Sequence, residues 1–383
     1  MRRSACYFPI VPNKIGEIKA VGHLSPRTRA RTRIVLEIDR PGDGDAAKLE
    51  EHIAGAARQI SEAWGTTYPL LVDMPEYGPD HRATNGSTLI EHPHVCLRQL
   101  GMLAVPVAGP VSAGGPEILE TVRDIARHER RGAALRIPFL ELSHVDILQR
   151  ELTSSMRILA HEPAEIDLLL DLEAVLHIPE HQRSTAHLTA VVHEALALVR
   201  QIGEFRNVIL CGSSVPENVG KQYNGAPYRG RRIELDVWRT LLPDAIMPVS
   251  FSDNGITPSR GPDPRGFGPA PARIRLSTPD EIVFYRANQK RYVDLCKRAL
   301  SSTDFDDRIP AWGATKLREC ARGHIAPSSP TEWVARDTNL HIETTVAEVQ
   351  RRLHATGRIR DYRFPEEEKF AWLQHNFLED EQV

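Results

Sequence analysis

Eight short apolar segments recur along the first 255 residues, and each is rich in valine, isoleucine or leucine. Their midpoints follow one another about every 34 residues, and segments of helical periodicity fill the intervals. Continuous apolar runs of this length are typical of parallel strands, because helices cover both faces of such a sheet. The segments are YFPIVP (7–12), RIVLEID (33–39), PLLVDM (69–74), LAVPVAG (103–109), AALRIPF (133–139), IDLLLDL (166–172), NVILCGS (207–213) and IMPVSFSDN (246–254). Eight strand-helix repeats predict an α/β fold, a (β/α)8 TIM-type barrel in which residues 7–12 lie beside residues 246–252.

The character of the sequence changes after the eighth segment. Residues 257–272 are dominated by proline and glycine, which argues against a helix or a central strand there. A hairpin is predicted over 273–286, a helix over 288–302 and an acidic terminal helix over 365–383. We therefore expect a barrel over residues 1–256 and, over residues 257–383, a C-terminal α+β extension that packs on it as part of the same domain.

The ends of several predicted helices carry recognisable capping residues. Gly65 follows a helical pattern over 46–64, where a glycine can end the helix. Ser143 and Ser184 precede two further helical patterns, and serine is a favoured N-cap residue. These signals place helices between the predicted strands.

Charge, cysteine content and hydropathy bound the class of protein. The formal net charge is −3 at pH 7, so no overall charge draws the chain to nucleic acid or to an anionic membrane. The five cysteines are odd in number and contain no C-x-x-C pair, which argues against a disulfide framework and a zinc ribbon. No apolar run approaches the roughly 20 residues of a membrane span. We expect a cytoplasmic protein with no cofactor, no metal and no membrane association, and the oligomeric state stays open.

Charged side chains gather at the carboxyl ends of the predicted strands, where barrels of this kind place their chemistry. Glu37, Asp73, Arg136, Asp171 and Asp253 each lie in or at the end of a different strand, so we expect them to face one another at one mouth. Such a set is the predicted catalytic site: it can bind a divalent cation, position a cationic substrate, or supply an acid and a base. The alternative is a structural ion network, because buried charges need partners whether or not they catalyse a reaction.

A second group of charges is basic and follows the seventh and eighth strands. Loops in these positions hold phosphate in many barrels, and arginine suits bidentate contacts with anions. The group comprises Lys221, Arg229, Arg231 and Arg232 after the seventh strand, and Arg260, Arg265, Arg273 and Arg275 after the eighth. The predicted ligand-binding residues are Lys14, Ser213, Arg229, Arg231, Arg232 and Arg275. Alternatively, the arginines form a solvated surface or pair with the acidic run at 366–368.

Several segments resemble, in the same order, those of a known family. They are YFPIVPNKIGEIKAVGHLSP (7–26), DLLLDL (167–172), VILCGSSVP (208–216), FSDNGITPS (251–259), WGATKLRECA (312–321) and PTEWVARDTNLHI (330–342). The chain resembles the "beta protein" family of phages and bacteria over nearly its whole length. The resemblance implies an association with mobile elements and antiviral defence, without a settled biochemical activity. In that family two histidines commonly follow the asparagine, whereas Asn339 is followed here by Leu340 and His341.

Two functions from different classes remain open. The first is an interaction protein, a sensor or scaffold in antiviral defence that contacts a phage component or a co-encoded effector. It is favoured by the resemblance and by the lack of a recognisable catalytic motif in the sequence. The second is a phosphate-directed hydrolase acting on a nucleotide or a nucleic-acid end. Fold alone cannot choose between them. We expect charges converging at an open mouth for the enzyme, and a mouth covered by residues 257–286 for the scaffold.

Overall fold

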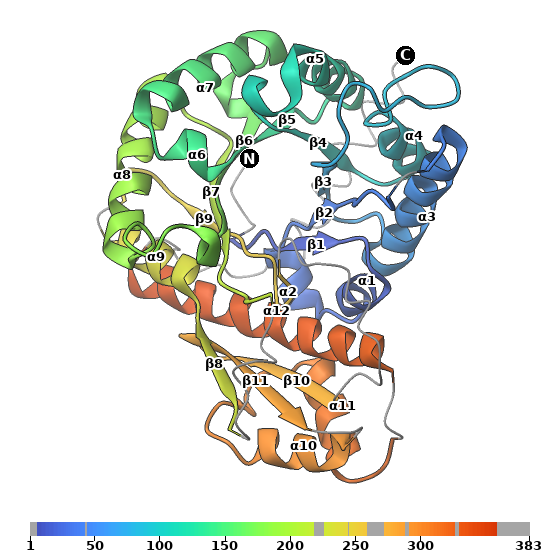
Figure 1. Ribbon diagram of the computed structural model, residues 1–383, viewed down its shortest axis with the longest axis vertical. Coiled ribbons are helices and arrows are strands. Elements are labelled where there is room, and N and C mark those ends of the chain that lie inside the picture. Colours follow the sequence, from blue (N-terminus) through green and yellow to red (C-terminus); the bar gives the residue numbers. More distant parts are fainter. Residues whose placement is uncertain are drawn as a thin grey trace.

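A curved parallel sheet organises the molecule. The computed structural model describes residues 6–42, 44–217, 226–243, 245–258, 272–287, 291–325 and 329–357. Within them, eight strands pair in the order β1-β2-β3-β4-β5-β6-β7-β9, inside a ring of helices (Figure 1). The strands are β1 (Ile10–Pro12), β2 (Val35–Glu37), β3 (Leu70–Asp73), β4 (Ala104–Ala108), β5 (Ala133–Ile137), β6 (Ile166–Ala174), β7 (Asn207–Ser213) and β9 (Ser250–Phe251). Each lies in a predicted segment, β6 continuing past its end, so the predicted parallel α/β sheet is confirmed.

Helices connect the strands and cover the outside of the sheet. They are α1 (Ile15–Gly22), α2 (Pro26–Arg31), α3 (Ala46–Trp64), α4 (His92–Gln99), α5 (Val111–Glu129), α6 (Phe139–Leu142), α7 (Val145–Leu159), α8 (Thr185–Ile202) and α9 (Ile233–Leu241). Gly65 ends α3 with φ +74°, and the Ser184 hydroxyl caps α8, as predicted. The prediction for Ser143 is wrong: α7 begins after His144, and the Ser143 hydroxyl donates to the carbonyl of Leu140 instead.

The two outermost strands of the sheet approach each other along residues 7–10, which are the first residue of β1 and the three residues before it. The Phe8 N–H donates to the carbonyl of Phe251 at 2.8 Å, and the Ile10 N–H donates to the carbonyl of Asp253 at 2.8 Å. One parallel bridge also joins Tyr7 to Phe251. The expected neighbours are therefore side by side. The two edges of the sheet are joined by one β-bridge and not by a continuous ladder of paired residues. The described architecture is therefore a curved eight-stranded parallel sheet.

Successive side chains of each strand point to opposite faces of the sheet and so belong to two separate apolar layers. One face of every strand packs against the helices in the main core. The other face builds a small apolar cluster of its own, made of Phe8, Ile10, Val35, Leu71, Val105, Val107, Ala134, Leu169, Ile209 and Cys211. Side chains two residues apart on a strand share a face. The residue two positions beyond Val35, Leu71, Ala134 or Leu169 therefore points into the same interior, nearer the carboxyl end of its strand.

A smaller antiparallel sheet lies beside the ring (Figure 1). It pairs β8 (Tyr228–Arg231), β10 (Ala272–Ser277) and β11 (Glu281–Ala287) in the order β10-β11-β8, and packs with α10 (Tyr292–Leu300) and α11 (Trp312–Ala321) around a second core. The predicted hairpin and the helix after it are confirmed by β10, β11 and α10. The prediction that Arg229 and Arg231 belong to a loop is wrong, because residues 228–231 pair with β11.

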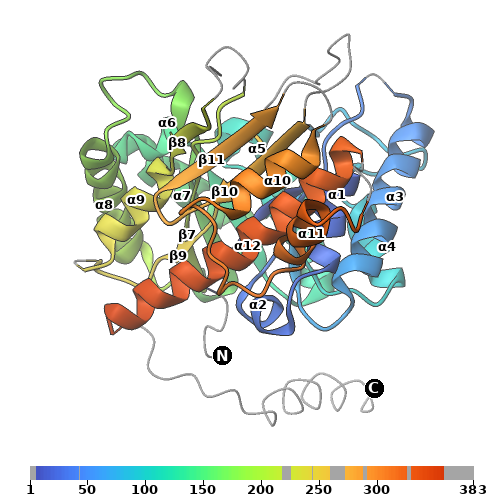
Figure 2. The ribbon, with the colours of Figure 1, turned by 90° about the horizontal axis from the view of Figure 1, so that it is seen from below.

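Helix α12 (Pro330–Ala355) joins the two cores. Its Ile342, Val346 and Val349 belong to the main core, whereas Trp333 and Leu340 belong to the second. Figure 2 shows α12 running beneath β10, β11, α10 and α11 and on past α2.

No described helix has the length and apolar character to cross a membrane. The predicted acidic helix over 365–383, and Lys221, Arg260 and Arg265, lie outside the described residues.

Candidate functional site

Four of the five predicted catalytic residues meet inside the curved sheet, at the carboxyl ends of the strands. Arg136 of β5 donates from Nη1 to Asp73 at 2.6 Å and to Glu37 at 3.0 Å. Its Nε donates to Asp171 at 2.7 Å, and Nη2 lies 2.7 Å from the same carboxylate oxygen. All three guanidinium nitrogens are therefore engaged by carboxylates. We call Glu37, Asp73, Arg136 and Asp171 the mouth cluster.

The mouth cluster is only partly withdrawn from water. The side chains of Arg136 and Glu37 are each 17% exposed, whereas those of Asp73 and Asp171 are 7% and 2% exposed. Burial raises the pKa of Glu37, and the nearby Asp73 and Asp171 add to this rise against the opposing effect of Arg136. Burial acts to lower the pKa of Arg136, but the three carboxylates outweigh it and raise that pKa well above its ordinary value. The arginine stays charged, and the raised pKa of Glu37 favours the protonated form of that carboxyl.

A β-bulge in β6 fixes the position of Asp171. The register between β6 and β7 shifts between Asp171 and Ala174, and Glu173 adopts a left-handed backbone with φ +56°. The Glu173 N–H donates to Asp171 Oδ1 at 2.8 Å, while Glu173 itself accepts from the Phe139 N–H at the start of α6. Bulges and positive φ values at non-glycine residues occur often beside functional sites. Here the strained turn holds one Asp171 oxygen and leaves the other for Arg136.

Asp253 does not join the mouth cluster, and the expectation that five residues converge is wrong in this respect. Its carboxylate accepts from the Tyr7 hydroxyl at 2.6 Å and from Arg232 Nη2 at 3.0 Å. His341 Nε2 lies 3.2 Å from both Asp253 oxygens, and His341 Nδ1 lies 2.6 Å from the Ser277 hydroxyl. The reason is positional: Asp253 lies beyond the end of β9, where α12 and β10 pack against the ring. We call Tyr7, Arg232, Asp253, Ser277, His341 and Thr345 the junction cluster.

The junction cluster is buried throughout, and its electrostatics follow from that burial. Burial on its own would raise the pKa of Asp253, but His341 and Arg232 outweigh it and hold that pKa well below its ordinary value. Burial and the Asp253 charge raise the pKa of Tyr7 well above its usual range. Nearby Glu234, which accepts from the Ser214 hydroxyl, has its pKa raised to about 7, chiefly by burial. Such a set joins parts of the chain and exposes no reactive atom.

The predicted ligand-binding arginines are engaged by carboxylates. Arg229 donates to Glu281 at 2.8 Å and to Asp304 at 2.9 Å, and Arg231 donates to Asp236 at 2.6 Å. Arg232 pairs with Asp253 in the junction cluster, and Arg275 Nη1 lies 3.9 Å from Asp337. Lys14 is exposed at the start of α1, and the buried Ser213 hydroxyl accepts from the Val215 N–H. Anion binding by these residues stays a prediction, and the arginines meet local acids instead of forming one basic surface.

Among the described residues, no group of three or more histidine, cysteine, aspartate or glutamate side chains is arranged to hold a metal ion. In the mouth cluster the Arg136 guanidinium fills the space between the three carboxylates. The arrangement can attract a cationic group, and it can exchange a proton at Glu37. The predicted covering segment 257–286 does not close over the mouth cluster within the described part, because residues 272–287 form two strands of the smaller antiparallel sheet and the turn between them (Figure 1).

Sequence reasoning missed four members of the junction cluster: Tyr7, Ser277, His341 and Thr345. Tyr7, for example, lies 246 residues from Asp253 and 334 residues from His341 along the chain. No sequence motif links the four, because they come from three separate parts of the chain: the residues before β1, strand β10 and helix α12. The only local signal was the polar run 252–254 at the end of the eighth apolar segment.

Comparison with known proteins places the chain in one family. The model of the Beta protein family matches residues 7–347, which span the curved sheet, the smaller antiparallel sheet and most of α12. No curated protein matches the chain. The resemblance drawn from the ordered segments is thereby confirmed: the chain belongs to the Beta protein family.

Proposed function

We propose that this chain is a recognition protein that binds a cationic group of a partner at the mouth cluster. The observation that carries the proposal is the charge balance around Arg136. Three carboxylates against one guanidinium leave a formal charge of −2 when all are ionised. Because Arg136 uses all three of its nitrogens on these carboxylates, it has no free edge for an anion. The complement of such a site is positive.

The surroundings suit a side chain better than a large ligand. Apolar residues such as Val35, Leu71 and Leu169 form the floor beneath the charges. Glu37 is the most exposed carboxylate and lies nearest to solvent. A lysine or arginine side chain entering from outside would pair with it in a partly desolvated setting, where ion pairs are stronger than in bulk water.

We propose further that the setting is antiviral defence, where the partner is a phage component or a co-encoded effector. Family membership supports this through the association with antiviral defence that the resemblance implies. We also infer that the sheet closes into a (β/α)8 barrel through residues 7–12, supported by the bridge between Tyr7 and Phe251. Slow amide exchange at Phe8 and Ile10 is the expected sign of closure.

Binding is tested with a fluorescein-labelled hexalysine peptide and its fully acetylated, uncharged counterpart. Asp73→Asn should weaken binding of the charged peptide by about tenfold, since one carboxylate is lost at the centre of the site. Asp124→Asn, an exposed carboxylate on α5, is the matched control and should leave affinity unchanged. Equal affinity of wild type and Asp73→Asn, or equal affinity for both peptides, would contradict the proposal.

The biological setting needs its own assay. Phage plating on cells that carry the gene with its genomic neighbours should show protection that Asp73→Asn removes and Asp124→Asn retains. Plating that is the same with and without the gene would contradict a defence role, while leaving peptide binding to be judged separately.

A phosphate-directed hydrolase is the second candidate. Its support is the raised pKa of Glu37 beside two other carboxylates. When neighbouring carboxyl groups have different environments, one can act as a general acid and another as a general base. It ranks below recognition because the arginines expected to hold phosphate are paired with acids. Phosphate release from nucleotides or nucleic-acid ends that is abolished by Glu37→Gln would reverse this ranking.

A further inference from the structure

Three arginines share one face of the smaller antiparallel sheet. Arg273 of β10 lies directly opposite Arg286 of β11 in the strand register. Arg275 follows two residues after Arg273, so its side chain points to the same face. The opposite face of both strands packs in the second core, through residues such as Ile274 and Val283. We call Arg273, Arg275 and Arg286 the arginine patch.

The arginine patch is electrostatically unfavourable on its own. Like charges that lie directly opposite each other on neighbouring strands destabilise a sheet. Burial lowers the pKa of Arg273, and the charges of Arg275 and Arg286 lower it further. Three positive charges are therefore held close together on a partly buried surface, where charges need partners.

The nearest carboxylate on α12 only partly balances this charge. Asp337 accepts from the Arg275 N–H at 3.0 Å, but its carboxylate lies 3.9 Å from Arg275 Nη1. Burial raises the pKa of Asp337 to about 8, so its negative charge is incomplete at pH 7. Among the described residues, no carboxylate lies within 4.0 Å of the Arg273 guanidinium. Arg275 Nε is buried without a hydrogen-bond partner there, in a side chain that is 10% exposed.

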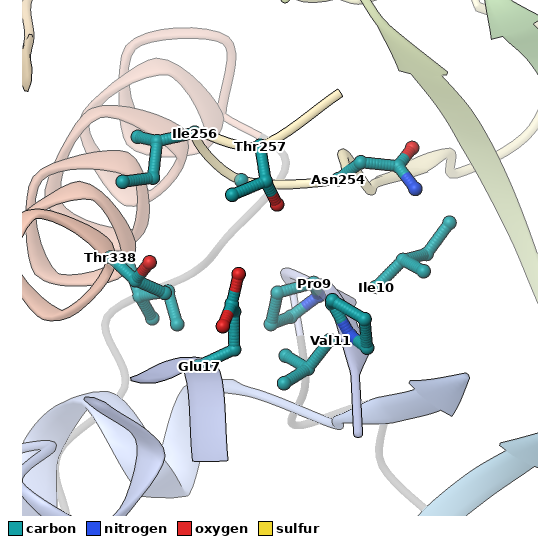
Figure 3. A pocket seen from close by; sticks show the side chains of 11 residues that line it. Pro9, Ile10, Val11, Glu17, Asn254, Ile256, Thr257 and Thr338 are labelled. Atoms are coloured by element: carbon teal, nitrogen blue, oxygen red, sulfur yellow. The ribbon is translucent and has the colours of Figure 1, made fainter. Parts of the chain in front are cut away.

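A second carboxylate near Arg275, that of Glu17 on α1, is engaged by other groups. Its charge opposes the lowering of the Arg275 pKa, but no ion pair joins the two side chains within the described residues. The Glu17 carboxylate accepts from the Thr257 hydroxyl, and it points toward Thr257 in Figure 3. Burial also raises the pKa of Glu17, which favours its neutral form. The arginine patch therefore keeps an excess of positive charge and an unused buried donor.

We propose that the arginine patch binds a dianionic phosphate group, either free or as a phosphomonoester. Three guanidinium groups against the Asp337 carboxylate leave a formal charge of +2 when all are ionised. Glu17 and Arg336 act on the same groups with opposite charges and leave this balance unchanged. A phosphomonoester carries about −1.5 to −2 charges at pH 7, and guanidinium groups match phosphate oxygens with paired hydrogen bonds. The ligand is opposite in charge to that of the mouth cluster, so this site goes beyond the proposed recognition function.

Binding is measured by isothermal titration calorimetry of the full chain with inorganic phosphate, adenosine 5′-monophosphate and adenosine at constant ionic strength. Wild type should bind the first two ligands and not adenosine. Tighter binding of the monophosphate would identify an esterified group as the ligand, and equal binding would show that the phosphate alone is recognised. Arg273→Gln should weaken phosphate binding by about tenfold, because a charge-assisted contact is lost. Arg308→Gln, which removes the same charge from a side chain that is 84% exposed, is the control and should leave affinity unchanged.

Thermal unfolding without phosphate provides a second measurement. Removing one of three like charges relieves repulsion, so Arg273→Gln should melt about 2 °C higher than wild type in chloride buffer. Melting below wild type would show that Arg273 is already paired and would overturn the proposal. So would the absence of phosphate binding by wild type, or equal affinity of wild type and Arg273→Gln. None of these results depends on hexalysine binding, so this proposal and the recognition function fail independently.

Discussion

The mouth cluster and the junction cluster use the same kinds of side chain in opposite ways. At the mouth, three carboxylates surround one arginine that is 17% exposed. At the junction, one carboxylate meets one arginine, their side chains are 2% and 0% exposed, and neutral hydroxyl groups and a histidine complete the set. Where water is excluded, charges must be matched nearly one to one. Where water reaches, an excess of charge is tolerated and remains available to a ligand.

The largest effect should come from the buried arginine of the junction cluster. Arg232→Met leaves Asp253 without its buried cation, and we expect the free energy of unfolding to fall by about 3–5 kcal/mol. Denaturant unfolding of the full chain measures it. The neighbouring Arg231→Ala is the control: its partner is Asp236 and its side chain is 68% exposed, so the loss should stay below about 1 kcal/mol. Equal losses for the two arginines would remove the distinction between buried and exposed pairs.

Arg136→Ala should be costly but less so than Arg232→Met. We expect a loss of about 3 kcal/mol, because three carboxylates are left facing one another at a mouth that water can reach. The repulsion among them should make the loss greater at low salt than at high salt. Unfolding at two ionic strengths provides the measurement. A neutral result in both would mean that the guanidinium does not hold the carboxylates together.

Glu234 gives the junction region a dependence on pH. Its pKa is raised to about 7, so between pH 4.5 and pH 7 the folded state binds more protons than the unfolded state. Stability from this group is therefore complete below pH 4.5 and is lost as pH rises through about 7, up to about 3 kcal/mol in all. Glu234→Gln should flatten that part of the stability curve. A wild-type curve that rises over this range and is unchanged in Glu234→Gln would contradict the assignment.

The smallest effect is expected for Glu37→Gln at the mouth. The pKa of Glu37 is raised, so its contribution is present below its unfolded pKa and is lost as pH rises through its folded pKa. Glutamine keeps an oxygen for Arg136 and removes the charge, so the variant should be at least as stable as wild type at pH 7. Unfolding at pH 5 and pH 7 tests this. A clear loss at pH 7 would show that the carboxylate charge is needed for folding.

Much of the fold could be predicted from local patterns. The eight apolar runs located every strand of the parallel sheet, and Ser184 marked the start of α8. The convergence of Glu37, Asp73, Arg136 and Asp171 was also predictable, because strand ends in a parallel sheet meet at one edge and alternation sets the face. Ser143 failed as a cap because a serine hydroxyl can equally bond to a nearby carbonyl.

The partners of charged residues could not be predicted in the same way. The cluster of arginines over 229–232 suggested a basic loop, yet β8 pairs with β11 and brings Arg229 to Glu281. Asp253 looked equivalent to Asp171, but Tyr7 and His341 reach it from distant parts of the chain. A charge in the sequence carries no record of which opposite charge will lie beside it.

The sequence by itself determined the periodic features of this protein: strand after helix, the apolar interior face, and four charges at one edge of the sheet. These depend on interactions between residues that are close in sequence or repeat with a fixed period. Only the tertiary structure decided that α12 would join both cores and that Asp253 would be buried with Arg232 and His341. Those outcomes depend on packing between elements hundreds of residues apart, where side-chain shape and the need to pair buried charges act together.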